Sequence, residues 1–139
     1  MLYLIGTGLS TKQLTLEALH AAQSCAEIFL ENYTNAFSHG DMYEMEKTLA
    51  QKITLLNRKG MEEDAQRILI IGNPLTATTH ISLLEECVNQ KINYRIIPGI
   101  SIFNYRGICG LDEYRFGRTT TLVFPYEGYE PLSTFDMIV

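Results

Sequence analysis

The sequence predicts an α/β fold, built on a mostly parallel five-stranded sheet with helices on both faces. Short apolar runs alternate with segments of helical periodicity through about the first hundred residues, a pattern typical of βαβ units. The run Ile68–Ile71 is apolar at every position, which favours a central strand covered on both sides. With 46% apolar and 19% charged residues, a chain of 139 residues can bury one sizeable core.

Each element follows from a local pattern. Strands are predicted at the short apolar runs Leu2–Ile5, Glu27–Leu30, Ile53–Leu56, Ile68–Ile71 and Tyr94–Ile97. Helices are predicted where apolar residues recur every three or four positions, at Leu14–Ser24, Met42–Leu49 and Thr78–Val88. After Pro98 we expect a short helix over Ser101–Ile108 with Ser101 as its N-cap, and then a strand over Thr119–Phe124.

Composition and charge argue against several classes of partner. The net charge is −5 and no basic stripe is visible, so we expect no nucleic-acid partner. No apolar stretch approaches the ~20 residues of a membrane span, and no signal-peptide pattern is visible, so no membrane partner is expected. Three cysteines without a C-x-x-C pair predict free thiols in a reducing, cytoplasmic setting. The three histidines lack ligand spacing, so no metal site is expected.

Three loops are candidates for a ligand site, because ligands of open parallel sheets bind beyond the carboxyl ends of the strands. The first loop holds Gly6-Thr7-Gly8, where two glycines allow a tight turn or a close approach to a ligand. Thr11 stands where a dinucleotide fingerprint would have its third glycine. From this loop alone, a plain strand-to-helix turn is equally compatible.

The second loop, residues 72–80, gathers small polar side chains between a strand and the next helix. Asn73, Thr76 and Thr78 could bind polar ligand atoms or simply cap the helix. His80, just inside the predicted helix, is expected to be structural rather than catalytic. In the third loop, Ser101 could cap a helix, contact a ligand, or do both. No catalytic triad or carboxylate pair is visible, which fits a reaction that depends on positioning.

Six segments occur in the order MLYLIGTGLS, LTLEAL, CAEIFLENYT, GNPLTATTH, IPGISIFN and CGLDEYRFGRTTTLVFP. Together they resemble the diphthine synthases, a family of the tetrapyrrole-methylase superfamily, and the form LENYT is closer to the eukaryotic members. The resemblance implies a methyltransferase with S-adenosylmethionine as cofactor. Its implied substrate is the modified histidine of translation elongation factor 2, on the route to diphthamide. It also implies a parallel sheet of order 3-2-4-1-5 and a second, mixed-sheet domain, with the cofactor between the two.

The resemblance also assigns residues and boundaries. Residues 1–116 would form the S-adenosylmethionine-binding domain, and residues 117–139 the beginning of the second domain. By position, the cofactor contacts would be Leu9, Asn73, Thr76, Ser101 and Ile102, whereas no catalytic residue can be named. Members of the family usually have Asp at position 73. Asn lacks the charge, and charge-assisted hydrogen bonds are roughly twice as strong as neutral ones, so we expect a lower cofactor affinity.

Two other functions stay open at this point. One is a binding or assembly module without activity, since the strand over Thr119–Phe124 could be an unpaired edge that pairs with another chain, for example in a homodimer. The other is a nicotinamide-dependent enzyme, suggested by Gly6-Thr7-Gly8 and by Glu31 after the second strand. The absent third glycine argues against the second alternative.

Overall fold

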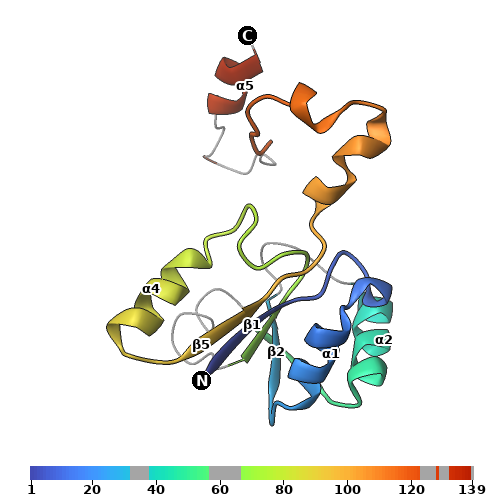
Figure 1. Ribbon diagram of the computed structural model, residues 1–139, viewed down its shortest axis with the longest axis vertical. Helices are drawn as coiled ribbons and strands as arrows, with labels where there is room; N and C mark the ends of the chain where they lie inside the picture. Colours follow the sequence, from blue (N-terminus) through green and yellow to red (C-terminus); the bar gives the residue numbers. More distant parts are fainter. Residues whose placement is uncertain (32–37, 57–66, 123–127, 129–131, 139) are drawn as a thin grey trace. The chain divides into compact units, whose positions relative to one another are not determined.

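The computed structural model describes residues 1–31, 38–56, 67–122, 128 and 132–138. The chain divides into two compact units, residues 1–104 and 105–139. The first unit contains an all-parallel five-stranded sheet in the order β3-β2-β4-β1-β5 (Figure 1). The strands are β1 (Leu2–Gly6), β2 (Ile28–Glu31), β3 (Ile53–Leu56), β4 (Arg67–Ile70) and β5 (Tyr94–Ile97). The α/β class is confirmed, and each predicted strand overlaps an observed one.

Strand β1 lies between β4 and β5, and this placement brings three strand exits together. Gly6 pairs with Ile70 of β4, while Ile5 pairs with Ile97 of β5. Because all three strands run in the same direction, the loops that follow them leave the sheet side by side. These are the three loops that the sequence indicated.

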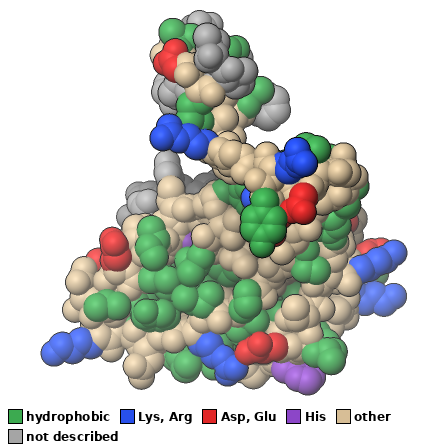
Figure 2. Space-filling model, turned by 45° about the horizontal axis from the view of Figure 1, so that its top comes forward, with side chains coloured by type: hydrophobic (Ala, Val, Ile, Leu, Met, Phe, Trp, Pro, Cys, Tyr) green, Lys and Arg blue, Asp and Glu red, His purple; other side chains and the backbone are tan. Residues whose placement is uncertain are grey.

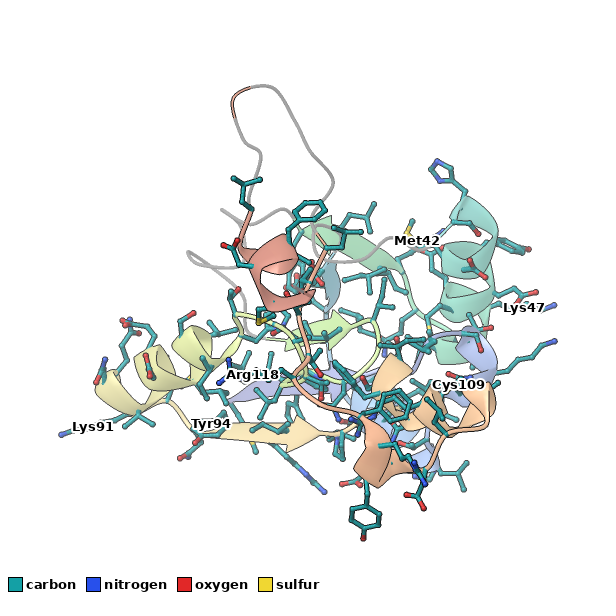
Figure 3. All side chains as sticks on the ribbon, turned by 90° about the horizontal axis from the view of Figure 1, so that it is seen from above. Met42, Lys47, Lys91, Tyr94, Cys109 and Arg118 are labelled. Atoms are coloured by element: carbon teal, nitrogen blue, oxygen red, sulfur yellow. The ribbon has the colours of Figure 1, made fainter. Side chains whose placement is uncertain are left out.

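Helices cover both faces of the sheet. Helices α1 (Leu16–Gln23) and α2 (His39–Leu49) lie on one face and α4 (Ile81–Asn89) on the other (Figure 1). Figure 3 shows Lys47 of α2 and Lys91, just after α4, on opposite sides of the sheet. The predicted arrangement of helices on both faces is therefore confirmed.

Each face has its own core. Ile5 and Met45 belong to the cluster under α1 and α2, whereas Leu4 and Leu84 belong to the cluster under α4. The neighbours Leu4 and Ile5 fall in opposite clusters because successive side chains of a strand point to opposite faces. The apolar character of the strands on both faces is thus explained by burial on both sides.

Local side-chain caps set the helix starts. The Thr15 hydroxyl accepts a hydrogen bond from the peptide N–H of Ala18 at 3.1 Å, which places the start of α1 at Leu16. Helix α2 begins with a capping box, in which Ser38 and Asp41 each accept from the other's peptide N–H. These caps fix where each helix leaves the preceding loop.

Three predicted elements need correction. Helix α4 begins at Ile81 and not at Thr78, because Thr78 caps a turn of the preceding loop. The helix after Ser101 is a 3₁₀ helix, η2 (Ile102–Cys109), and Ser101 does cap it by accepting from the N–H of Phe103 at 3.3 Å. Residues 119–122 form no strand, since none of the described strands offers them a ladder partner. The last two residues of that predicted strand, 123 and 124, lie outside the described residues.

The second unit consists of short elements. After η2 it contains the 3₁₀ helix η3 (Glu113–Arg115) and helix α5 (Ser133–Ile138). An ion pair joins Arg106 to Glu113, and the hydroxyl of Thr134 donates to the carbonyl of Thr121 at 3.0 Å. The predicted boundary at residue 117, with a mixed-sheet domain beyond it, stays a prediction.

The remaining features of the fold are its surface charge, the length of its helices and the state of its cysteines. The charged side chains on the face shown in Figure 2 are dispersed and form no basic stripe. Among the described residues, no helix is both long and apolar enough to cross a membrane. All three cysteines are free thiols, with Cys25 and Cys87 buried and Cys109 exposed.

Candidate functional site

Three glycines bring the candidate loops into direct backbone contact at the carboxyl end of the sheet. A Cβ atom placed on Gly99 would lie 2.2 Å from the carbonyl oxygen of Gly72 and 2.7 Å from the carbonyl carbon of Gly6. A Cβ on Gly6 would lie 2.4 Å from the nitrogen of Gly99. No side chain fits at either position, so the exits of β1, β4 and β5 meet through peptide groups alone. We call this contact the glycine junction, formed by Gly6, Gly72 and Gly99.

Hydrogen bonds at and next to the glycine junction also join the three loops. Gly8 and Gly72 form an isolated bridge, with N···O distances of 3.2 Å and 2.8 Å. Both glycines have left-handed backbone angles, with φ of +74° and +83°, which other residues adopt at a cost. The amide nitrogen of Asn73 donates to the carbonyl of Gly99 at 3.2 Å. The three loops are therefore connected to one another by hydrogen bonds.

The first loop is held by a residue that the sequence analysis missed. The amide oxygen of Gln13 accepts a hydrogen bond from the peptide N–H of Leu9 at 2.8 Å. Its Cβ lies 2.6 Å from where a Cβ on Gly8 would stand, so the glycine makes room for this side chain. Leu9 in turn lies over Gly72, with its Cδ2 3.7 Å from the position of a Cβ there. A long amide side chain four residues after Leu9 was the available signal.

The second loop is organised by both ends of the Asn73 amide. Its oxygen accepts from the peptide N–H of Leu75 at 3.0 Å, as in an Asx turn. Its nitrogen donates to Gly99, and its backbone carbonyl accepts from the N–H of Thr76 at 3.2 Å. An aspartate could accept from Leu75, but its ionised carboxylate could not donate to Gly99. Asn at this position thus has a structural use, while the predicted lower cofactor affinity stays a prediction.

The third loop places Ser101 under cover and Ile102 in the open. Ser101 is 8% exposed, and its peptide N–H donates to the Asn104 side-chain oxygen at 2.8 Å. Ile102 begins η2 with its side chain 64% exposed. The structural alternative for Ser101, a helix cap, is confirmed. Its contact with a cofactor stays a prediction.

The structure gathers most of the predicted contact residues. Leu9 and Asn73 lie at the glycine junction, Ser101 follows two residues after Gly99, and Thr76 is joined to Asn73 by a backbone hydrogen bond. For Ile102, the structure shows only that its side chain is exposed at the start of η2. None of the five carries a charge, since Asn73, Thr76 and Ser101 are neutral polar residues and Leu9 and Ile102 are apolar.

The start of α1 argues against a dinucleotide site. In that arrangement the helix begins at the glycine-rich turn and directs its N–H groups at the pyrophosphate. Here a separate 3₁₀ turn, η1 (Thr11–Gln13), intervenes, and α1 begins only at Leu16. Glu31 is fully buried, so in this structure its carboxylate is not accessible to the ribose of a dinucleotide. Within the described parts of the chain, no three His, Cys, Asp or Glu residues are placed to hold a metal ion.

Comparison with known proteins agrees with this fold and shows the family of the chain. The family model of tetrapyrrole (corrin/porphyrin) methylases matches residues 1–124, and the chain belongs to this family. Among curated proteins, the diphthine methyl ester synthases of Mus musculus and Saccharomyces cerevisiae are each 35% identical to it over 99% of the chain. The chain covers 53% and 50% of their lengths, and so spans about half of each of these relatives.

A solved structure gives the same relationship in three dimensions. The crystal structure of a diphthine synthase matches 84% of this chain with a TM-score of 0.72 and 30% identity. The match covers 51% of that chain. The resemblance noted in the six sequence segments is therefore confirmed at the level of both sequence and fold.

Proposed function

We propose that this chain is the methyl-donor-binding part of an S-adenosylmethionine-dependent methyltransferase of diphthamide biosynthesis. The observation that carries the proposal is the glycine junction, where three loops meet through their backbones at the carboxyl end of the sheet, in a chain of a methylase family. The names of the relatives support diphthamide biosynthesis as the pathway. Translation elongation factor 2, through its modified histidine, is the proposed substrate, which would place the reaction in the cytoplasm.

The residues at the junction suit this cofactor. When bound, S-adenosylmethionine supplies an electrophilic methyl group on a positively charged sulfur. Leu9 offers an apolar surface beside Gly72, and Asn73 and Thr76 are half-buried side chains that are polar but neutral. We infer that Asn73, Thr76, Ser101 and Ile102 complete the contacts. Carbonyl oxygens and neutral side chains tolerate a cationic ligand, whereas a lysine or arginine among these contacts would repel it.

The proposed chemistry depends on positioning. Displacement at a methyl carbon requires the incoming amine and the leaving sulfur to lie in line, so a rigid donor site lowers the entropic part of the barrier. The backbone contacts at the glycine junction provide rigidity, because Gly6, Gly72 and Gly99 touch through main-chain atoms that no side-chain rotation can move apart. No residue is assigned the removal of the amine proton.

Calorimetric titration with S-adenosylmethionine tests the donor site. We expect saturable binding that S-adenosylhomocysteine displaces. Leu9→Ala should weaken it about tenfold, because part of a leucine's burial energy, about 1.4 kcal/mol, would be lost. Leu16→Ala is the matched control, since Leu16 is 74% exposed on α1 and should leave the affinity unchanged. Absence of binding in the wild-type chain would contradict the proposal.

Transfer of a labelled methyl group tests the substrate. Elongation factor 2 is isolated from cells blocked at this methylation step and incubated with the chain and methyl-labelled S-adenosylmethionine. We expect label on the modified histidine and none on factor that lacks the earlier modification. Donor binding without any transfer would favour the module without activity. Light scattering of the same sample tests the predicted homodimer, which a monomer mass would contradict.

A further inference from the structure

The ring of His80 is buried and makes its hydrogen bonds through one nitrogen. The residue is 2% exposed, and its Nδ1 lies 2.5 Å from the hydroxyl oxygen of Thr78 and 3.1 Å from the carbonyl oxygen of Pro74. A carbonyl oxygen can only accept, so a hydrogen bond to Pro74 requires the hydrogen on Nδ1, and the Thr78 hydroxyl oxygen then accepts from the same N–H. We assign this tautomer because the opposite one would leave Nδ1 and the Pro74 carbonyl oxygen as two acceptors in contact.

This contact closes the second loop on itself. The hydroxyl of Thr78 donates to the same Pro74 carbonyl at 3.2 Å and accepts from the peptide N–H of His80 at 2.9 Å. Between Pro74 and Thr78, Ala77 has a left-handed backbone with φ of +55°. An alanine keeps this conformation only where the surroundings enforce it. The closed segment begins immediately after Asn73 and contains Thr76.

The other ring nitrogen is unused within the described residues. His80 Nε2 is buried and has no hydrogen-bond partner there. With Nδ1 protonated, Nε2 of the neutral ring is an acceptor, and burying an unpaired acceptor carries a desolvation cost. An apolar ring at position 80 would avoid the desolvation cost of Nε2, so this nitrogen does not explain why the residue is a histidine. The polar contribution of His80 therefore lies in Nδ1–H and its hold on Pro74.

We propose that His80 is a positioning residue of the donor site. Its Nδ1–H holds the Pro74 carbonyl and so presents Asn73 and Thr76 to the methyl donor. The inference rests on the proposed function, because it concerns how the same loop binds S-adenosylmethionine. His80 itself is too deeply buried to contact donor or substrate. It acts through the backbone of residues 73–78.

Three substitutions separate the two ring nitrogens. His80→Asn keeps an N–H donor at the place of Nδ1, His80→Gln moves it toward the place of Nε2, and His80→Phe keeps only the ring volume. Donor affinity is measured by calorimetry well below the melting temperature, and amide hydrogen exchange is followed over residues 72–80. We expect His80→Asn to bind within about threefold of wild type, and the other two variants about tenfold more weakly, as for loss of one buried hydrogen bond.

Hydrogen exchange should show the same order, with protection in residues 72–80 kept in His80→Asn and lost in the other two variants. Protection in the strands should be equal in all of them. Equal donor affinity and equal exchange protection in His80→Asn and His80→Phe would overturn the proposal. It would also be overturned if the variants lost thermal stability while their donor affinity and exchange protection stayed those of wild type. If the wild-type chain bound no donor, the proposed function would fail, yet the exchange data would still decide the role of His80.

A second variant keeps the test open if the histidine variants do not fold. Thr78→Val removes the hydroxyl that bonds to both Pro74 and His80. We expect loss of exchange protection in the same segment and a donor affinity about tenfold weaker. Thr79→Val is the matched control, because Thr79 is exposed in the same loop. Unchanged protection and affinity in Thr78→Val would overturn the proposal.

Discussion

Replacing Gly99 by alanine should separate the three loops of the glycine junction. The new Cβ would stand 2.2 Å from the carbonyl oxygen of Gly72, with the backbone of Gly6 on its other side at 2.7 Å. Real Cβ atoms essentially never approach another atom within 3.0 Å, so the backbone must move. Gly99 has no left-handed φ, and the cost of the alanine is therefore a steric one. Backbone atoms, unlike side-chain ends, cannot rotate away.

Overpacking of a tight site costs about 1–3 kcal/mol, and a site enclosed by backbone falls at the upper end. We therefore expect Gly99→Ala to lower the free energy of unfolding by about 3 kcal/mol. For a domain of this size, that corresponds to a melting temperature lower by about 10 °C. Donor binding should be lost as well, because Asn73 hydrogen-bonds to the displaced Gly99 carbonyl.

Urea unfolding followed by far-UV circular dichroism measures the loss of stability. The matched control is Gly40→Ala, because Gly40 is exposed in the first turn of α2 and a Cβ there meets only Ser38 Oγ at 3.7 Å. That variant should be as stable as wild type or more stable by up to about 1 kcal/mol, since alanine favours helices. If Gly99→Ala changed stability by less than about 0.5 kcal/mol, the close packing of the three loops would be refuted.

Three further predictions concern the pH dependence of stability, the thiols and a strained residue. The peptide N–H of Ile53 donates to Glu46 at 3.0 Å and holds the pKa of this carboxyl below its usual value. The stability it adds is present at neutral pH, above the unfolded-state pKa of about 4.3, and is lost as the pH falls through the lower folded-state pKa. Glu46→Gln should flatten this acid limb in urea titrations from neutral to acidic pH, and an unchanged limb would contradict it. Ellman's reagent should label Cys109 rapidly but Cys87 only after unfolding, because burial makes Cys87 inaccessible and raises the pKa of its thiol. Fast labelling of Cys87 in the native chain would contradict its burial. Ala77→Gly should stabilise the chain by up to about 1 kcal/mol, since glycine adopts a left-handed backbone without cost, whereas a melting temperature below that of wild type would show that Ala77 is not strained.

Much of the fold could be predicted because its signals are local. The period of the apolar residues shows each strand and helix, as Leu4 and Ile5 illustrate by entering opposite cores. Caps are local as well, and Ser101 was recognised from its position before an apolar segment. The strand predicted over Thr119–Phe124 failed in its described part because β propensity forms a strand only where another strand offers hydrogen bonds.

The candidate site was predictable in its location but not in its contacts. Strand exits in a parallel sheet share one edge, so the glycines and small polar residues after β1, β4 and β5 could be singled out beforehand. Gln13 was missed because an amide side chain has no periodic signature. The start of α4 was placed three residues early, because the hydroxyl of Thr78 competes with the helix for the peptide N–H of His80.

By itself, the sequence determined the alternation of strands and helices, the two-faced burial of the sheet and the loops that could bind a ligand. The tertiary structure decided that Gly6, Gly72 and Gly99 touch, and that the Asn73 amide spans two loops. Those contacts join residues far apart in the chain, and they depend on the strand order and register that bring β4 and β5 to either side of β1. Strand order is set by how all the apolar faces pack together, which no single segment of the sequence encodes.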